Sequence, residues 1–155
     1  MDEIVARGLA KWPNVPAVYG WLELDRRGNW LIKGERIGNQ ALREFIARNY
    51  EADGQGRWFF QNGPQRVFVK LAYTPLVVHH EGDSLVDHCG RPFESRRVFQ
   101  DDEGSVLIEG ERAIALLDDR DLARYAELAE RLPRIAKAEV ETRFGFVKDP
   151  SPALR

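Results

Sequence analysis

The sequence has a single cysteine in 155 residues, so it cannot form an internal disulfide. That usage favours a reducing compartment. No apolar run approaches the ~20 residues that a membrane-spanning helix needs. The first twelve residues carry two acids and lack a basic start ahead of an apolar run, which argues against a secretory signal. We therefore predict a cytoplasmic protein that does not associate with membranes.

Neither sign of charge dominates, because 25 acidic residues stand against 23 Lys and Arg and the net charge is -2. This balance gives no electrostatic reason to expect nucleic acid as a partner. The sequence also lacks the phosphate-binding loop G-x-x-x-x-G-K-[ST], the dinucleotide motif G-x-G-x-x-G and the nucleophile elbow G-x-S-x-G. We therefore expect no cofactor, and no enzyme class is indicated by a motif.

An internal repeat is the strongest pattern that the sequence does contain. Residues 21–36 (WLELDRRGNWLIKGER) and 97–112 (RVFQDDEGSVLIEGER) align without a gap and share seven of sixteen positions. In each copy an Asp opens and a Gly closes a four-residue turn between two strands. The motif G-E-R that ends both copies could mark a paired ligand site, but a strand end followed by a turn explains it more simply.

The order of elements predicts an α+β fold in which helices pack on an antiparallel sheet of hairpins. Asn39 is a good N-cap, and the apolar residues that follow predict a helix over 40–50. A second helix is predicted over 121–132, capped by Asp118 or Asp119, and a short helix over 2–10. We expect a single domain, 1–155, built from two related strand-strand-helix units at about 17–71 and 75–132, with a loosely ordered tail from about 142 to 155.

The stretch 57–71 contains the strongest hairpin signal, Asn62-Gly63 between two aromatic and β-branched runs. If Gln61 faces Pro64, then Trp58 faces Val67, and one face of the hairpin is core. The other face alternates cations with aromatic rings. We predict that this cation–aromatic face binds a ligand or partner; its residues are Arg57, Phe59, Arg66, Phe68 and Lys70. The alternative is that a helix covers the two phenylalanines.

All three histidines and the cysteine fall within 79–89, a composition that suits zinc. In a regular hairpin, however, only His79 and His88 share a face, whereas His80 and Cys89 point to the other. Two ligands fall short of a tetrahedral site. We therefore prefer a sheet surface to a metal site here. A Ser84 or Cys89 nucleophile near His88 is the only local hydrolase candidate, and it is disfavoured because Asp87, which would orient His88, is its neighbour on the strand and points to the opposite face.

The chain resembles an uncharacterised bacterial family, one of the domains of unknown function. The resemblance rests on a progression of G-x-W, G-x-x-I and L-x-x-F, present as Gly28 to Trp30, Gly34 to Ile37 and Leu42 to Phe45, followed by Thr74-Pro75. It covers about residues 17–132. The resemblance implies a fold of repeated strand and helix motifs and a role in signal transduction.

Three hypotheses of function follow. The first is a non-catalytic binding module for a protein partner or small ligand, in signalling if the resemblance holds. The second is a small-molecule or metal-dependent enzyme centred on the hairpin His79–Cys89. The third is a structural protein that forms homo-oligomers. A copurifying ligand or metal, a captured partner, or a symmetric oligomer alone would distinguish them.

Overall fold

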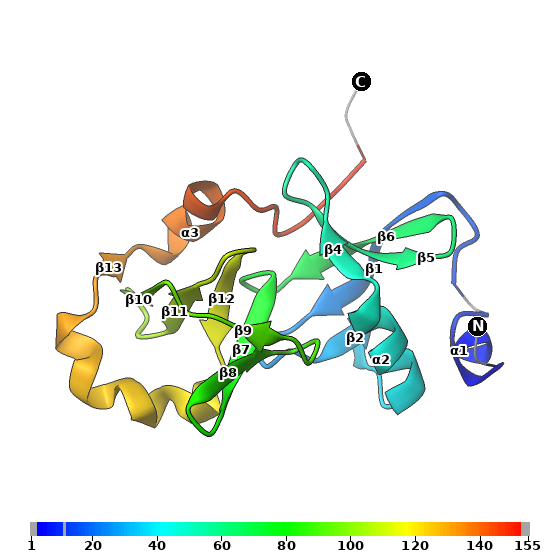
Figure 1. The fold of residues 1–155 in the computed structure, drawn as a ribbon. Helices are drawn as coiled ribbons and strands as arrows, with labels where there is room; N and C mark the ends of the chain where they lie inside the picture. The colour runs from blue at the N-terminus through cyan, green and yellow to red at the C-terminus, as the bar shows by residue number, and fades with distance from the viewer. Residues whose placement is uncertain (1–2, 11, 153–155) are drawn as a thin grey trace. The chain divides into compact units, whose positions relative to one another are not determined.

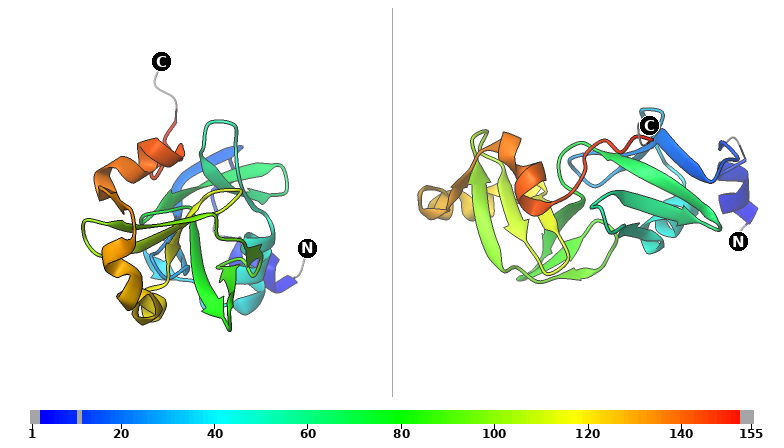
Figure 2. Two further views of the ribbon diagram at one scale, coloured as in Figure 1. Left: turned by 60° about the vertical axis from the view of Figure 1, so that its left-hand side comes forward. Right: turned by 90° about the horizontal axis from the view of Figure 1, so that it is seen from above.

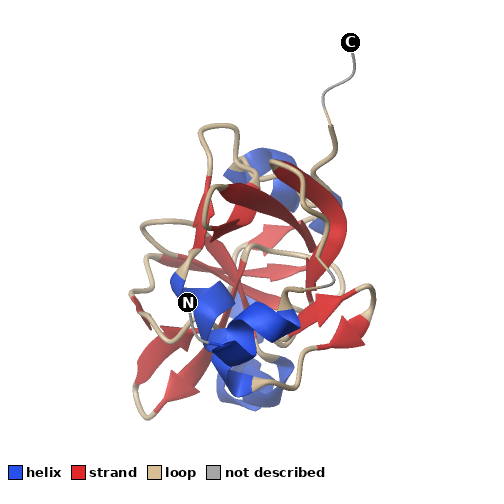
Figure 3. Ribbon diagram, turned by 90° about the vertical axis from the view of Figure 1, so that its right-hand side faces the viewer, coloured by secondary structure: helices blue, strands red, loops and turns tan. Residues whose placement is uncertain are grey.

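The structure is a computed structural model that describes residues 3–10 and 12–152. It is an α+β fold in which strands provide most of the regular structure (Figures 1 and 3). The chain forms two compact units. The first comprises the described residues of 1–25, 29–72 and 147–155, and the second comprises 26–28 and 73–146. No helix among the described residues has the length and apolar character needed to cross a membrane.

A six-stranded sheet forms the first unit, in the order β3-β2-β1-β6-β5-β4. The strands are β1 (Ala17–Leu24), β2 (Trp30–Ile32), β3 (Glu35–Arg36), β4 (Tyr50–Ala52), β5 (Trp58–Asn62) and β6 (Gln65–Leu71). Two helices accompany them, α1 (Glu3–Gly8) and α2 (Gln40–Arg48). Because β1 pairs with β6 in parallel, the sheet is mixed.

Helix α2 begins and packs as its sequence predicts. The side chain of Asn39 accepts a 2.9 Å hydrogen bond from the backbone N–H of Leu42, which caps the helix. Leu42 and Ile46 are buried, and the ring of Phe45 meets Phe60 edge-on at 5.5 Å. Full burial of such side chains contributes about 1.5–3 kcal/mol each. Helix α2 therefore covers the Trp58 and Phe60 face of the sheet, which is the core of this unit.

A seven-stranded sheet forms the second unit, in the order β13-β10-β11-β12-β7-β8-β9. The strands are β7 (Leu76–Glu81), β8 (Ser84–Asp87), β9 (Pro92–Phe93), β10 (Arg97–Asp101), β11 (Val106–Glu109), β12 (Ile114–Leu117) and β13 (Arg134–Ile135). Helix α3 (Lys137–Phe144) packs on β10 through Phe144 and Phe99, whose ring centroids lie 5.8 Å apart.

The prediction of an antiparallel sheet is wrong in part, because three strand pairs are parallel: β1 with β6, β7 with β12 and β10 with β13. Each parallel pair joins strands that are far apart in the sequence, as a crossover connection requires. The hairpin signals used for the prediction are local and indicate only antiparallel neighbours. They therefore do not predict these three parallel pairs.

The predicted helix over 121–132 forms as a different kind of helix. It is a 3₁₀ helix, η1 (Asp119–Arg131), which curves from the end of β12 toward β13 (Figures 1 and 2). Its N-cap is Asp118, as expected, and none of its residues is buried. A 3₁₀ helix has three residues per turn, so residues three apart lie in one row along it. Even the apolar side chain of Leu128 is 43% exposed on this helix. With no buried side to favour α-helical spacing, the tighter helix is observed.

One turn design occurs four times. At Asp25, Asp53, Asp87 and Asp101 the aspartate backbone N–H donates to the carbonyl four residues later, and Oδ1 accepts the N–H of that same residue. The glycine at the fourth position has a φ of 81°, 78°, 84° and 85° in turn. That left-handed conformation is nearly reserved for glycine. The pattern Asp-x-x-Gly therefore sets four hairpin turns among the residues that the structure describes.

The predicted loose tail overlaps ordered structure. Its first residues, 142–144, lie in α3, and Phe146 is 5% exposed. Beyond that, the N–H of Val147 donates to Gly56 and the N–H of Leu71 donates to Lys148. Residues 153–155 lie outside the described residues.

Candidate functional site

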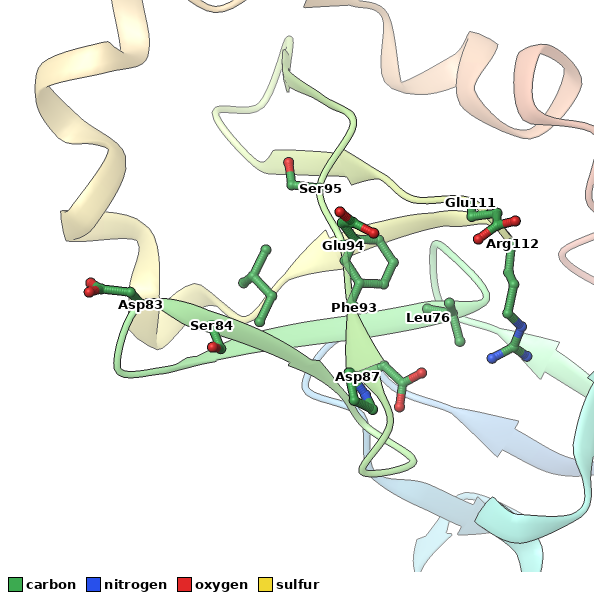
Figure 4. A pocket seen from close by; sticks show the side chains of 11 residues that line it. Leu76, Asp83, Ser84, Asp87, Phe93, Glu94, Ser95, Glu111 and Arg112 are labelled. Atoms are coloured by element: carbon green, nitrogen blue, oxygen red, sulfur yellow. The ribbon is translucent and has the colours of Figure 1, made fainter.

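A cleft of about 480 Å³ opens within the second unit (Figure 4). Strands β7, β8 and β9 provide one part of its lining, and the turn that joins β11 to β12 provides another. Its volume lies within the range of about 300–1,000 Å³ that small-molecule sites occupy. This cleft is therefore a candidate ligand site.

The apolar wall of the cleft consists of Leu76, Leu85 and Phe93. Phe93 is held by a close approach to Gly110, where a Cβ atom would lie 2.6 Å from the ring carbon Cζ. Real Cβ contacts are never that short, so only glycine at position 110 lets the ring sit where it does. The wall therefore has an aromatic surface, and Gly110 is the residue that makes room for it.

The charged lining of the cleft is predominantly acidic. Four carboxylates, from Asp83, Asp87, Glu94 and Glu111, face one guanidinium, from Arg112. Asp83, Glu94 and Glu111 are exposed and form the rim, whereas Asp87 is 2% exposed. Charges in a concave site reinforce one another because the walls exclude water. The cleft should therefore attract positive groups.

Asp87 is placed by one of the four Asp-x-x-Gly turns. Its Oδ1 accepts hydrogen bonds from the backbone N–H groups of Cys89 (2.9 Å) and Arg91 (3.0 Å). In the other three turns Oδ2 is also engaged, by the Asn29 amide, the Arg57 guanidinium and the Tyr73 hydroxyl respectively. Among the described residues, we find no hydrogen bond to Oδ2 of Asp87. Asp87 is thus the one of these four aspartates whose Oδ2 accepts no hydrogen bond from the described residues, and it lines the cleft.

The predicted cation–aromatic face lies on the first sheet, with its cations over its rings. The Arg57 guanidinium carbon lies 4.7 Å from the centroid of Phe68, and that of Arg66 lies 4.2 Å from Phe59. Phe59 and Phe68 are 1% and 3% exposed. Tyr19 stacks on Phe68 at 4.8 Å, whereas the predicted covering helix, 40–50, packs on the opposite face.

The strand pairing beneath that face differs from the predicted one by two residues. Asn62 pairs with Gln65, and Phe59 faces Phe68, so the turn is Gly63-Pro64. Proline has no N–H to donate to a strand pair and its ring fixes φ near -65°, so it belongs in the turn. A shift of two leaves every side chain on its predicted face, which explains why the cations still reach the rings diagonally. Arg66 and Lys70 are exposed. Ligand binding by this face stays a prediction.

The histidines do not gather around one point. His79 Nε2 lies 3.3 Å from Glu81, and His80 Nε2 lies 2.8 Å from the Tyr125 hydroxyl. His88 lies in the turn after β8, where its Nδ1 accepts the N–H of Val77 at 3.1 Å. Among the described residues, no group of three or more His, Cys, Asp or Glu side chains could hold a metal ion. Burial, followed by the charge of Asp87, raises the pKa of the Cys89 thiol to about 12, so this thiol is a poor nucleophile.

The two G-E-R copies end in different structures. In the first, Lys33 and Gly34 both have positive φ, 52° and 82°, and form a two-residue turn between β2 and β3. In the second, Gly110 accommodates the Phe93 ring, and Glu111 and Arg112 line the cleft. The copies thus supply a turn in one unit and part of a site in the other.

Sequence reasoning missed the cleft because its residues come from five short segments between positions 76 and 112. One signal was available. The pattern Asp-x-x-Gly at Asp87, repeated at three other positions, could have placed His88 and Cys89 in a turn instead of a strand. It would also have marked Asp87 as a turn aspartate beside an aromatic and acidic stretch.

Fold and site together define an α+β protein with two mixed sheets and an acidic, aromatic-walled cleft. The DUF2944 family model, described as "Protein of unknown function (DUF2946)", matches residues 1–151. Because the match spans nearly the whole sequence, the chain belongs to this family of proteins of unknown function. The predicted membership of a domain-of-unknown-function family is confirmed. No curated protein matches the sequence.

Two solved structures share the fold. A DUF1285 family protein from Silicibacter pomeroyi DSS-3 superposes with a TM-score of 0.56 at 16% identity, covering 83% of this chain and 85% of that chain. A DUF1285 family protein from Shewanella baltica OS155 gives a TM-score of 0.52 at 14% identity, covering 71% and 95%. At these identities the likeness concerns the fold alone.

Proposed function

We propose that the chain is a non-catalytic binding module of the bacterial cytoplasm, with the cleft of the second unit as its ligand site. The observation that carries the proposal is the cleft itself, because it combines an aromatic and aliphatic wall with a few charged groups. That combination is typical of small-ligand sites. A role in signalling follows only from the family resemblance, and ligand binding is the property such a role would need.

The test is native mass spectrometry of the untagged protein, followed by amide chemical-shift mapping with a set of small probes. A bound mass, or shifts confined to Leu85, Phe93 and the 110–112 turn, would support the proposal. Shifts elsewhere, with the cleft amides unchanged, would reject the cleft as the site. Turnover of a probe that disappears on substitution of His88 would instead support the enzyme hypothesis.

The cation–aromatic face of the first sheet is a second candidate, for a protein partner. It is favoured by the exposure of Arg66 and Lys70 on one face of β6 and by the position of the Arg66 guanidinium over the buried ring of Phe59. An Arg66→Glu protein should keep its fold, because the cation–π contact with Phe59 contributes only about 0.5–1 kcal/mol at an exposed site. Loss of a partner captured by the unaltered protein would support this surface; retention of every partner would reject it.

We also infer that the two units descend from one ancestral unit. The observation in favour is a shared pairing scheme: the first strand of each repeat pairs antiparallel with the second and parallel with a strand beyond the following helix, β1 with β6 and β10 with β13. The paired residues Leu24 and Trp30 correspond to Gln100 and Val106. In a sequence profile of the family, the region of residues 21–36 should align with the region of residues 97–112. If the two regions fail to align in most family members, the duplication is contradicted.

A further inference from the structure

The spare acceptor on Asp87 identifies the chemistry of the ligand. A buried carboxylate needs partners for its lone pairs, because an unsatisfied buried charge is costly. The turn supplies two N–H donors to Oδ1, and the protein supplies none among the described residues to Oδ2. The equivalent Oδ2 atoms of Asp25, Asp53 and Asp101 are bound by donors at 2.9, 2.7 and 2.8 Å. Oδ2 of Asp87 is not one of the fully buried side-chain atoms that lack a partner, so it is open to the cleft, and its donor is water or a ligand.

The surroundings of Asp87 restrict what that donor can be. The exposed carboxylates of Asp83, Glu94 and Glu111 give the rim the same negative sign, which repels anions. Phe93, Leu76 and Leu85 give the walls an apolar surface that suits methylene groups. A ring face is also a favourable surface for an organic cation. A bare metal ion is a poorer fit, since no group of three potential ligands gathers here among the described residues.

Resting on the proposed function of the cleft, we propose that it binds an alkylammonium or alkylguanidinium group, with Asp87 Oδ2 as the acceptor and the apolar wall along the alkyl stem. The group could be carried by a free amine or by a basic side chain of a peptide. Arg112 provides the only positive charge among the lining residues.

The turn itself provides a reporter for this contact. The N–H groups of Cys89 and Arg91 donate to Oδ1 of Asp87, so a cation that binds Oδ2 should shift both amide resonances. The N–H groups of Glu103 and Ser105 donate to Asp101 in the same geometry and serve as internal controls. Because Tyr73 already occupies Oδ2 of Asp101, those two amides should not respond.

The experiment is an amide chemical-shift titration at constant ionic strength with butylguanidinium chloride, n-butylammonium chloride, butanol, sodium butyrate, calcium chloride and a blocked Gly-Arg-Gly peptide. We expect saturable shifts at Cys89, Arg91 and Phe93 with the cations. Asp87→Asn keeps an oxygen for the turn but places an amide at Oδ2, and it should weaken cation binding by about tenfold or more. Asp25→Asn, the same change in an equivalent turn outside the cleft, should leave binding unchanged within about twofold.

Should Asp87→Asn fail to fold, Glu94→Gln combined with Glu111→Gln removes two rim charges without touching the turn and should weaken cation binding by several-fold. Tighter binding of the peptide than of butylguanidinium would assign the ligand to a polypeptide; equal affinity would assign it to a small amine. Saturable cleft shifts with butanol or butyrate, and none with the cations, would overturn the cation assignment but preserve the binding function. If no probe shifts the cleft amides, both the cation assignment and the binding function of the cleft are overturned. If calcium chloride gives equal shifts, the effect is charge screening and the cation assignment is overturned.

Discussion

The Tyr73 hydroxyl donates a 2.8 Å hydrogen bond to Oδ2 of Asp101, and the two residues are 2% and 0% exposed. Burial first, and then this hydrogen bond, raise the pKa of Tyr73 well above its usual value, so the phenol stays protonated and keeps donating. The bond completes the turn between β10 and β11, because Oδ1 of the same carboxylate holds the N–H groups of Glu103 and Ser105.

Tyr73→Phe should therefore destabilise the protein by about 1–3 kcal/mol, because it leaves a buried carboxylate oxygen without its donor. Urea denaturation followed by circular dichroism would show a lower midpoint with an unchanged slope. The matched control is Tyr19→Phe, which keeps the ring that stacks on Phe68. Equal midpoints for the two variants would contradict a role for the Tyr73 hydroxyl.

A second prediction concerns η1 and acid. His80 fastens this helix to the β7–β8 hairpin, through its ring to Tyr125 and through its backbone N–H to Oδ2 of Asp121. Burial, followed by the charge of Arg124, lowers the pKa of His80 below its usual 6.5. Between the folded and unfolded pKa values the unfolded state binds more protons, so stability falls as the pH drops below about 6.5 and levels off below the folded pKa.

Hydrogen exchange of the η1 amides, corrected for the intrinsic pH dependence, should accelerate over that acidic window. His80→Gln cannot be protonated and should flatten the response. The control is His79→Gln, since the neighbouring His79 ring is paired with exposed Glu81. An unchanged response in His80→Gln would exclude His80 as the titrating group.

The third prediction is that Cys89 reacts slowly in the native protein. Its thiol pKa of about 12 leaves, at pH 8, a thiolate fraction smaller by about 100-fold or more than that of an ordinary cysteine. Reaction with Ellman's reagent should be correspondingly slow in buffer and reach one equivalent rapidly in urea. Rapid native modification would show that the Asp87 turn opens readily, which would weaken the case for a preformed site.

Gly110→Ala is the fourth prediction. The added methyl group would meet the Phe93 ring at 2.6 Å, so the ring must move, at a cost of about 1–3 kcal/mol. Gly38→Ala is the matched control, because a Cβ there meets nothing within 4 Å and the backbone needs no left-handed conformation. That control should change stability by less than about 1 kcal/mol in either direction. A Gly110→Ala protein as stable as the control, with unshifted Phe93 resonances, would show that the ring is not held by this approach.

Local patterns were sufficient for elements whose causes are local. The Asn39 cap and the apolar face of α2 follow from neighbours within a few residues, and each is observed where the sequence predicts it. The Gly63-Pro64 turn shows the limit. The Asn62-Gly63 signal favours pairing Gln61 with Pro64, but Pro64 has no N–H to donate in that pair. Asn62 therefore pairs with Gln65 instead.

Tertiary causes account for what the sequence did not reveal. The parallel pairing of β1 with β6 depends on where α2 returns the chain, and the 3₁₀ form of η1 depends on the absence of a buried side. The cleft depends on Phe93 reaching Gly110 across seventeen positions. The cation–aromatic contacts were foreseen because alternation along a strand survives a register shift of two.

The hydrogen bonds of Val147 and Leu71 have a practical consequence for how the protein is divided. Because the segment after α3 adds to the sheet of the first unit, that unit is discontinuous in sequence. A fragment that stops at residue 72 would leave the N–H of Leu71 and the carbonyl of Gly56 without the partners that residues 147 and 148 supply. Deletion of the C-terminal residues should consequently weaken the N-terminal sheet, and a circularly permuted chain that joins the two segments would be the shortest way to isolate this unit.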